Sequence, residues 1–234
     1  MVRLFYSRAS LVSTFRLVAV VAALAAGPGR AAEPPTFSQG GFIFALQYGP
    51  GFWLVNEAAL GAQAGAGYAN VFVSDLVTSH TLSLSAKYVI LGHASIGVDF
   101  TATGWDVFSS NRGGAGFLVG TVGWHPLELV FKLLEYEKRP VTFDVSTWVG
   151  LGYGIAGERL GSDGLTVEWG VTFDWFFTRF FALGTFARGA FLKWNSLYLD
   201  FNNRDVPGNT VPLPNGLGGA FWTLGLSLTF RAGD

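Results

Sequence analysis

Long stretches of the chain alternate strictly between apolar residues and polar or small residues. The clearest run places apolar side chains at Leu165, Val167, Trp169, Val171, Phe173 and Trp175, with Thr166, Glu168, Gly170, Thr172 and Asp174 between them. Segment 220–230 repeats this alternation. A period of two residues is typical of β-strands whose two faces meet different surroundings. The chain is therefore predicted to be built from strands with one apolar and one polar face.

Eight such strands are predicted, and they give an all-β fold. They are 41–48, 81–91, 94–105, 115–125, 141–155, 164–176, 180–194 and 219–230. Short turns follow the second and sixth strands, a longer connection spans 126–140, and long loops lie at the other end. An even number of strands with this loop asymmetry is typical of antiparallel transmembrane up-and-down barrels. Segment 66–74 is a further candidate strand, so ten strands are the alternative.

The direction of the apolar face separates a membrane barrel from a soluble, lipocalin-like barrel. Charged residues make up only 13% of the chain, against about 25% in soluble domains. Aromatic residues gather near the strand ends, as in interfacial girdles. One group is Trp105, Trp194 and Trp222, and the other is Trp124, Trp175, Phe176, Phe177, Phe180, Phe181 and Phe230. We therefore expect the apolar faces to point outward, into lipid.

The charges that fall on the polar faces would then lie inside the barrel. They are Lys87, Asp99, Asp144, Glu168, Asp174 and Arg188. An eight-stranded barrel is only wide enough for side chains, and its buried charges need partners. A turn about Thr178 would place Glu168 opposite Arg188, and a turn about His93 would place Lys87 opposite Asp99. We expect this lumen charge network to plug the barrel; a polar path for ions is the alternative.

Residues 1–32 have the features of a secretory signal peptide. Arg3, Arg8 and Arg16 form a positive region, an apolar run of ten residues follows from Leu17 to Ala26, and small residues come next. Cleavage near Ala31 fits the small-x-small rule. The chain is thus predicted to be exported, with the barrel domain at 33–234.

Composition and histidine placement argue against several classes of function. The chain has no cysteine and a formal net charge of −1, so no basic surface for nucleic acid is indicated. Of the three histidines, His93 and His125 are expected at the periplasmic side and His80 at the outer rim. Ser79 and His80, as neighbours in a strand, point to opposite faces. We therefore predict no catalytic residues, no metal site and no cofactor.

The connection 126–140 has a helical pattern. Pro126 suits the first turn of a helix, and Glu128, Lys132 and Glu135 would share one helical face opposite Leu127, Val130 and Leu134. The pattern predicts a short amphipathic helix. Two placements stay open: the membrane interface on the periplasmic side, or a helical cap under the barrel.

The last strand carries a more specific motif. Thr223, Gly225, Leu228 and Phe230 resemble the β-signal of outer-membrane barrels, which reads polar, any, glycine, two of any, hydrophobic, any, aromatic. Four residues, Arg231 to Asp234, follow the aromatic position, where that motif usually ends. By pattern, residues 37–230 resemble the small OmpA/OmpX-like outer-membrane β-barrel families. The resemblance implies a Gram-negative outer membrane, its lipids as partners, and insertion by the barrel-assembly machinery.

The function expected from these features is a non-enzymatic, porin-like outer-membrane protein with a filled lumen and exposed loops. Its role would be structural or surface interaction, and the stretch 198–203 exposes aromatic and amide groups for it. The first alternative is a narrow pore, suggested by the glycine-lined face at Gly150, Gly152, Gly154 and Gly170. The second is a lipid-modifying enzyme, which would depend on His80.

Overall fold

The computed structural model describes residues 41–55, 77–90, 93–105, 113–133, 143–157, 161–178, 180–198, 205–207, 210–212 and 218–233. The predicted leader and the candidate strand 66–74 lie outside the described residues. Asp75, Glu135 and the stretch 199–204 do so as well.

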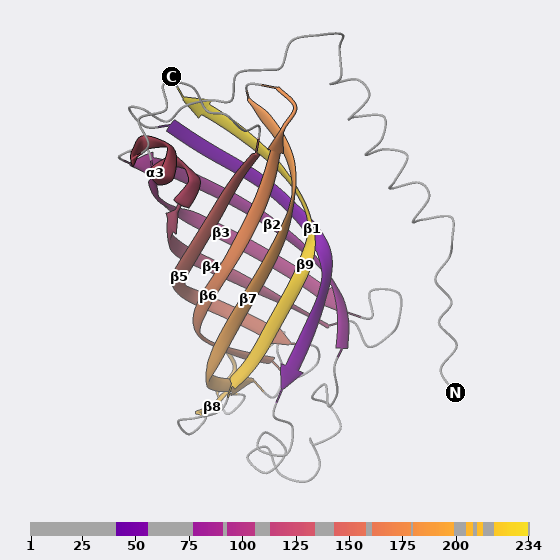
Figure 1. Ribbon diagram of the computed structural model, residues 1–234. Helices are drawn as coiled ribbons and strands as arrows, with labels where there is room; N and C mark the ends of the chain where they lie inside the picture. The colour runs from indigo at the N-terminus through magenta and orange to yellow at the C-terminus, as the bar shows by residue number, and fades with distance from the viewer. Residues whose placement is uncertain are drawn as a thin grey trace, which may run out of the picture.

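Eight antiparallel strands close into a barrel (Figure 1). They are β1 (Gly41–Val55), β2 (Val77–Ile90), β3 (Ala94–Trp105), β4 (Gly113–Trp124), β5 (Phe143–Gly157), β6 (Gly161–Phe176), β7 (Phe181–Tyr198) and β9 (Gly218–Gly233). Each pairs with its neighbours in chain order, and β9 pairs with both β7 and β1 to complete the ring. Because β1 and β2 pair directly, no strand stands between them in the ring, and the prediction of eight strands is confirmed.

Two elements lie outside this ring. The three-residue β8 (Thr210–Pro212) pairs only with β7. The helix α3 (Pro126–Leu133) follows β4 directly, as the pattern of the 126–140 connection predicts. In the part of the chain described here, no helix is long and apolar enough to cross a membrane.

The two ends of the barrel differ, and we name them by their connections. The turn end carries α3, the connections β2–β3 and β6–β7, and the end of β9; the loop end carries β8 and the connections β1–β2, β3–β4 and β5–β6 (Figure 1). The β5–β6 connection is short, because β5 ends at Gly157 and β6 begins at Gly161. Several strands run further than predicted. β1 continues past Pro50 to Val55 and β9 continues past Phe230 to Gly233, because pairing with neighbours extends beyond the clear alternation.

The barrel is apolar outside and polar inside, as expected from the charge distribution. Leu118 and Val122 on the outer face are each 60% exposed, whereas Thr101 and Glu168 on the inner face are fully buried. A soluble barrel has the opposite arrangement. An outer face of this kind matches a hydrocarbon environment and would be costly in water.

Two of the predicted girdle residues point the other way. Phe176 and Trp194 are buried in the lumen, at 3% and 4% exposure. Each lies two residues from an inward-facing neighbour, Asp174 or Leu192, and side chains two residues apart in a strand point to the same face. The girdle prediction was wrong for these two residues. By contrast, Trp124, Trp175 and Trp222 are exposed on the outer face.

Candidate functional site

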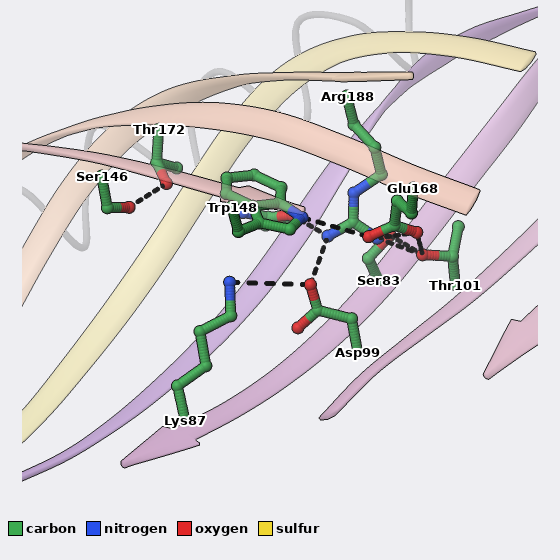
Figure 2. Close-up of polar contacts among 10 residues, drawn as sticks. Ser83, Lys87, Asp99, Thr101, Ser146, Trp148, Glu168, Thr172 and Arg188 are labelled. Atoms are coloured by element: carbon green, nitrogen blue, oxygen red, sulfur yellow. Dashed lines mark hydrogen bonds and ion pairs between the residues drawn. The ribbon is translucent and has the colours of Figure 1, made fainter. Parts of the chain in front are cut away.

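The lumen is the candidate site, and its middle is occupied by Arg188. This residue projects from β7, and its guanidinium reaches β3 on the opposite wall, four strands away in either direction around the ring. There Nη2 lies 3.6 Å from Oδ2 of Asp99, and Nη1 donates to Oγ1 of Thr101. Nη2 also donates to Oε1 of Gln47 on β1, at 2.8 Å. Arg188 therefore spans the full width of the barrel (Figure 2).

Glu168 is the second carboxylate held by Arg188. Its Oε2 lies 3.4 Å from Nη1 of Arg188 and accepts a hydrogen bond from Thr101. Its Oε1 accepts a hydrogen bond from the indole N–H of Trp148, at 3.2 Å. Charge-assisted hydrogen bonds are stronger than neutral ones, and a buried carboxylate requires such partners. Glu168 is thus fixed between three walls of the barrel.

Lys87 completes this set, which we call the middle layer: Gln47, Lys87, Asp99, Thr101, Trp148, Glu168 and Arg188. Its Nζ lies 3.6 Å from Asp99 and 4.2 Å above the ring of Trp148 (Figure 2). Two cations thus face two carboxylates, and their formal charges cancel. Balanced charges of this kind reduce the cost of burial in a region of low dielectric constant.

Both expected ion pairs are present, but the predicted registers were wrong by two residues. Glu168 faces Ala190 rather than Arg188, and Lys87 faces Gly97 rather than Asp99. The pairs form diagonally instead. A shift of two residues keeps every side chain on the same face, and long side chains reach the diagonal neighbour. The ion pairs were therefore predicted correctly although the register was not.

A second group of charges lies toward the turn end. Arg231 on β9 forms an ion pair with Asp144 on β5, and its guanidinium lies 4.7 Å from the centre of the Phe176 ring. Nδ1 of His125 lies 3.0 Å from Oδ2 of Asp144. Asp174 accepts hydrogen bonds from Ser227 and Thr229. We call these five residues, Arg231, Asp144, His125, Asp174 and Phe176, the turn-end layer.

Asp144 and Asp174 were expected in one network with the other four lumen charges. The structure instead places them in the turn-end layer. A cavity of about 20 Å³, lined by Lys87, Asp174 and Arg231 among others, lies between the two layers. It has room for about one water molecule.

Toward the loop end, two phenylalanines meet across the lumen. Phe117 on β4 and Phe221 on β9 come from opposite walls, and their ring centres are 5.9 Å apart. Each is 1% exposed. Together with the two charged layers, this Phe117–Phe221 pair makes a third crossing of the lumen.

The glycines that suggested open space are covered by larger side chains. A Cβ on Gly170 would lie 2.3 Å from Trp148, one on Gly150 2.5 Å from Val119, and one on Gly154 2.6 Å from Phe117. Gly152 faces the backbone of Leu118 in the same way. The glycines make room for these neighbours, so the space beside them that suggested a pore is occupied.

The residues of the β-signal-like motif all lie at the seam where β9 meets β1. Thr223 donates a hydrogen bond to the carbonyl of Pro50, at 2.8 Å, and a Cβ on Gly225 would lie 2.2 Å from the carbonyl oxygen of Tyr48. Leu228 faces outward. The ring of Phe230 packs against Phe44 on β1 and against Phe180 and Phe181 at the start of β7. These residues therefore contribute contacts to barrel closure.

Two of the histidines lie at different places in the barrel, His80 on the outer face and His125 in the lumen. Ser79 points into the lumen and contacts Thr103, while His80 points outward to the hydroxyl of Tyr48. His125 belongs to the turn-end layer. Within the described ranges, no group of three or more His, Cys, Asp or Glu residues is placed to hold a metal ion.

Gln47, Trp148 and Arg231 are among the lumen residues that the sequence prediction missed. All three have the parity of inward-facing positions, so parity alone could have identified the first two. Trp148 was overlooked because an aromatic residue is expected on the lipid face. Arg231 was overlooked because it follows Phe230, the expected end of the strand.

Comparisons with known proteins show likeness in fold. No family model matches the chain, and no curated protein matches it in sequence. Neisserial surface protein A aligns over 80% of this chain and 96% of its own, with 11% identity and a TM-score of 0.49. The attachment invasion locus protein Ail of Yersinia pestis aligns over 82% and 99%, with 12% identity and a TM-score of 0.44. The outer membrane protein OprG of Pseudomonas aeruginosa aligns over 87% and 100%, with 9% identity and a TM-score of 0.40.

Proposed function

We propose that the protein is an integral outer-membrane barrel without enzymatic activity, whose closed lumen serves as a rigid support for the loops at the loop end. The observation that carries this proposal is Arg188. It crosses the barrel from β7 to Asp99 and Thr101 on the opposite wall. An arginine ion-paired on both sides fills the space that a solute or ion would need.

Residence in a membrane is supported by the outer face. Its apolar side chains, including Leu118, Val122 and Leu151, are 58–60% exposed. Burial of that much apolar surface in hydrocarbon is favourable by roughly 25 cal/mol per Å². β-strands can cross a bilayer only as a closed barrel, because an open sheet would leave unpaired backbone groups at its edges. The ring of this protein is closed.

A structural or surface-interaction role is supported by what the lumen lacks. In the described part of the barrel, the three crossings occupy the axis at three heights, and the cavity between two of them has room for about one water molecule. With transport and catalysis unsupported by the side chains present, the connections at the loop end are the part of the molecule that can meet external partners.

The proposal is tested by locating the protein and by measuring leakage. The full chain, produced in a Gram-negative host, is expected in the outer-membrane fraction of a density gradient and is expected to shift on a gel after heating. Purified barrel in lipid vesicles is expected to release no more potassium than protein-free vesicles. Recovery in the soluble fraction would refute the membrane assignment, and rapid potassium release would refute the closed lumen.

A further inference from the structure

The helix α3 starts from a fixed point on the rim of the barrel. The residue before it, His125, donates its backbone N–H to the carbonyl of His93, at 2.8 Å, and its side chain lies against Asp144 in the lumen. Pro126 then begins the helix. Because His125 is held at two points, α3 can extend only from the rim beside β4.

The apolar side chains of α3 do not all pack on the barrel. Val130 is 44% exposed and Leu133 is 72% exposed. Residues three apart lie on the same side of a helix, so these two form one apolar surface that faces away from the protein. In a cap that closes the barrel from below, that surface would instead be buried against the rim.

This surface continues the outer apolar band. Trp124, two residues before α3, is 47% exposed on the lipid face, and Trp175 on β6 at the same end is 63% exposed. Tryptophan is enriched at the level of the lipid headgroups. α3 itself contacts β5, the strand between these two tryptophan-bearing strands in the ring. The helix therefore leaves the barrel at the level that the tryptophans mark.

We propose that α3 binds the lipid surface of the periplasmic leaflet, lying among the headgroups with Val130 and Leu133 turned toward the acyl chains. This rests on the proposed membrane function. Helices with one apolar face bind the interface in this orientation. The anchor would hold the barrel rim beside β4 and β5 at the level of the headgroups.

The absence of cysteine from the sequence allows a direct test. Spin labels are attached to single-cysteine variants of the full mature barrel in lipid vesicles, at Val130→Cys and Leu133→Cys. Leu118→Cys, in the middle of the apolar band, is the hydrocarbon control, and Asp205→Cys, exposed near the loop end, is the water control. For each label, collision with oxygen, which concentrates in lipid, is compared with collision with a water-soluble nickel chelate. A heat-shift gel confirms that every variant is folded.

The expected result is that the labels at 130 and 133 resemble Leu118→Cys more than Asp205→Cys, with collision by the nickel chelate at least about threefold below the water control. Labels at 130 and 133 that match the water control, beside a Leu118 label in hydrocarbon, would overturn the anchor and leave the membrane barrel standing. A Leu118 label that collides freely with the nickel chelate would overturn the membrane function itself.

Discussion

The middle layer and the turn-end layer both bury charged side chains in the lumen, but they stabilise those charges in different ways. In the middle layer, Lys87 and Arg188 face Asp99 and Glu168, so two formal positive charges meet two negative ones. In the turn-end layer, Arg231 pairs with Asp144, while Asp174 is held by the hydroxyls of Ser227 and Thr229. The middle layer relies on ion pairs, and the turn-end layer on one ion pair supported by neutral donors.

The difference follows from depth in the barrel. Charges far from both openings are costly unless their partners neutralise them, and the middle layer is the layer enclosed on both sides. The turn-end layer lies closer to one end of the barrel, and there the hydroxyls of Ser227 and Thr229 supply the donors for the Asp174 carboxylate. Substitutions in the middle layer should therefore be more damaging than those in the turn-end layer, and the predictions below test that order.

The largest effect is expected from Arg188→Ala. It leaves Glu168 without its cation and Asp99 with Lys87 alone, in the most enclosed part of the lumen. Removing one partner of a buried pair costs about 3–5 kcal/mol, and that loss in the free energy of unfolding should appear in urea titrations of the barrel in lipid vesicles, followed by tryptophan fluorescence.

The matched control is the double variant Glu168→Ala/Arg188→Ala. It removes one charge of each sign and leaves the Lys87–Asp99 pair intact, so it is expected to be more stable than Arg188→Ala. Equal stability of the single variant and the unmodified barrel would mean that Arg188 does not hold the layer.

A smaller effect is expected from Arg231→Ala. The substitution removes the ion pair with Asp144 and the contact with Phe176, but Asp144 keeps His125 as a hydrogen-bond partner at 3.0 Å. The loss is therefore closer to that of a hydrogen bond to a charged group, roughly 1.5–3 kcal/mol. The same urea titration should show a loss of about 2 kcal/mol. A loss larger than that of Arg188→Ala would reverse the order of the two layers.

Truncation after Phe230 sharpens this prediction. It removes the Arg231 side chain together with the hydrogen bond from its backbone N–H to the carbonyl of Phe180 and with the pairing to Ile43. The truncated barrel should therefore be less stable than Arg231→Ala. If the two are equally stable, the extension of β9 contributes only through its arginine.

The smallest effect is expected from Lys87→Met. Methionine keeps an apolar stem over Trp148, and Asp99 retains Arg188 at 3.6 Å. Lys87 is also the one cation of the middle layer whose side chain reaches 11% exposure. A loss of about 1 kcal/mol is expected, comparable with one ordinary hydrogen bond. A loss equal to that of Arg188→Ala would show that the two cations are equivalent.

The sequence was informative wherever parity decides the outcome. Glu168, Asp99 and Lys87 could be assigned to the lumen because a two-residue period fixes the face of every residue in a strand. Parity does not fix register, so the facing pairs were predicted two residues away from their true positions. Parity also does not show where a strand ends, so Arg231, which follows Phe230, was not predicted to lie in the lumen.

Some features depended on packing between distant strands. The contact of Phe117 with Phe221 joins residues 104 positions apart, and nothing local in the sequence identifies it. In the same way, the space left by Gly170 is filled by Trp148 from the neighbouring strand. A glycine-rich face could be read from the sequence, but which side chain covers it could not.

The central claim is that three crossings close the lumen, and single-channel recording tests it most directly. The mature chain is refolded, checked by heat shift, and added to a planar bilayer, with an open porin in the same bilayer as the positive control. The account predicts no conductance steps above those of the protein-free membrane. Steady, reproducible openings by the folded barrel would contradict it, because ions would then pass a lumen that Arg188, Arg231 and the Phe117–Phe221 pair are claimed to fill.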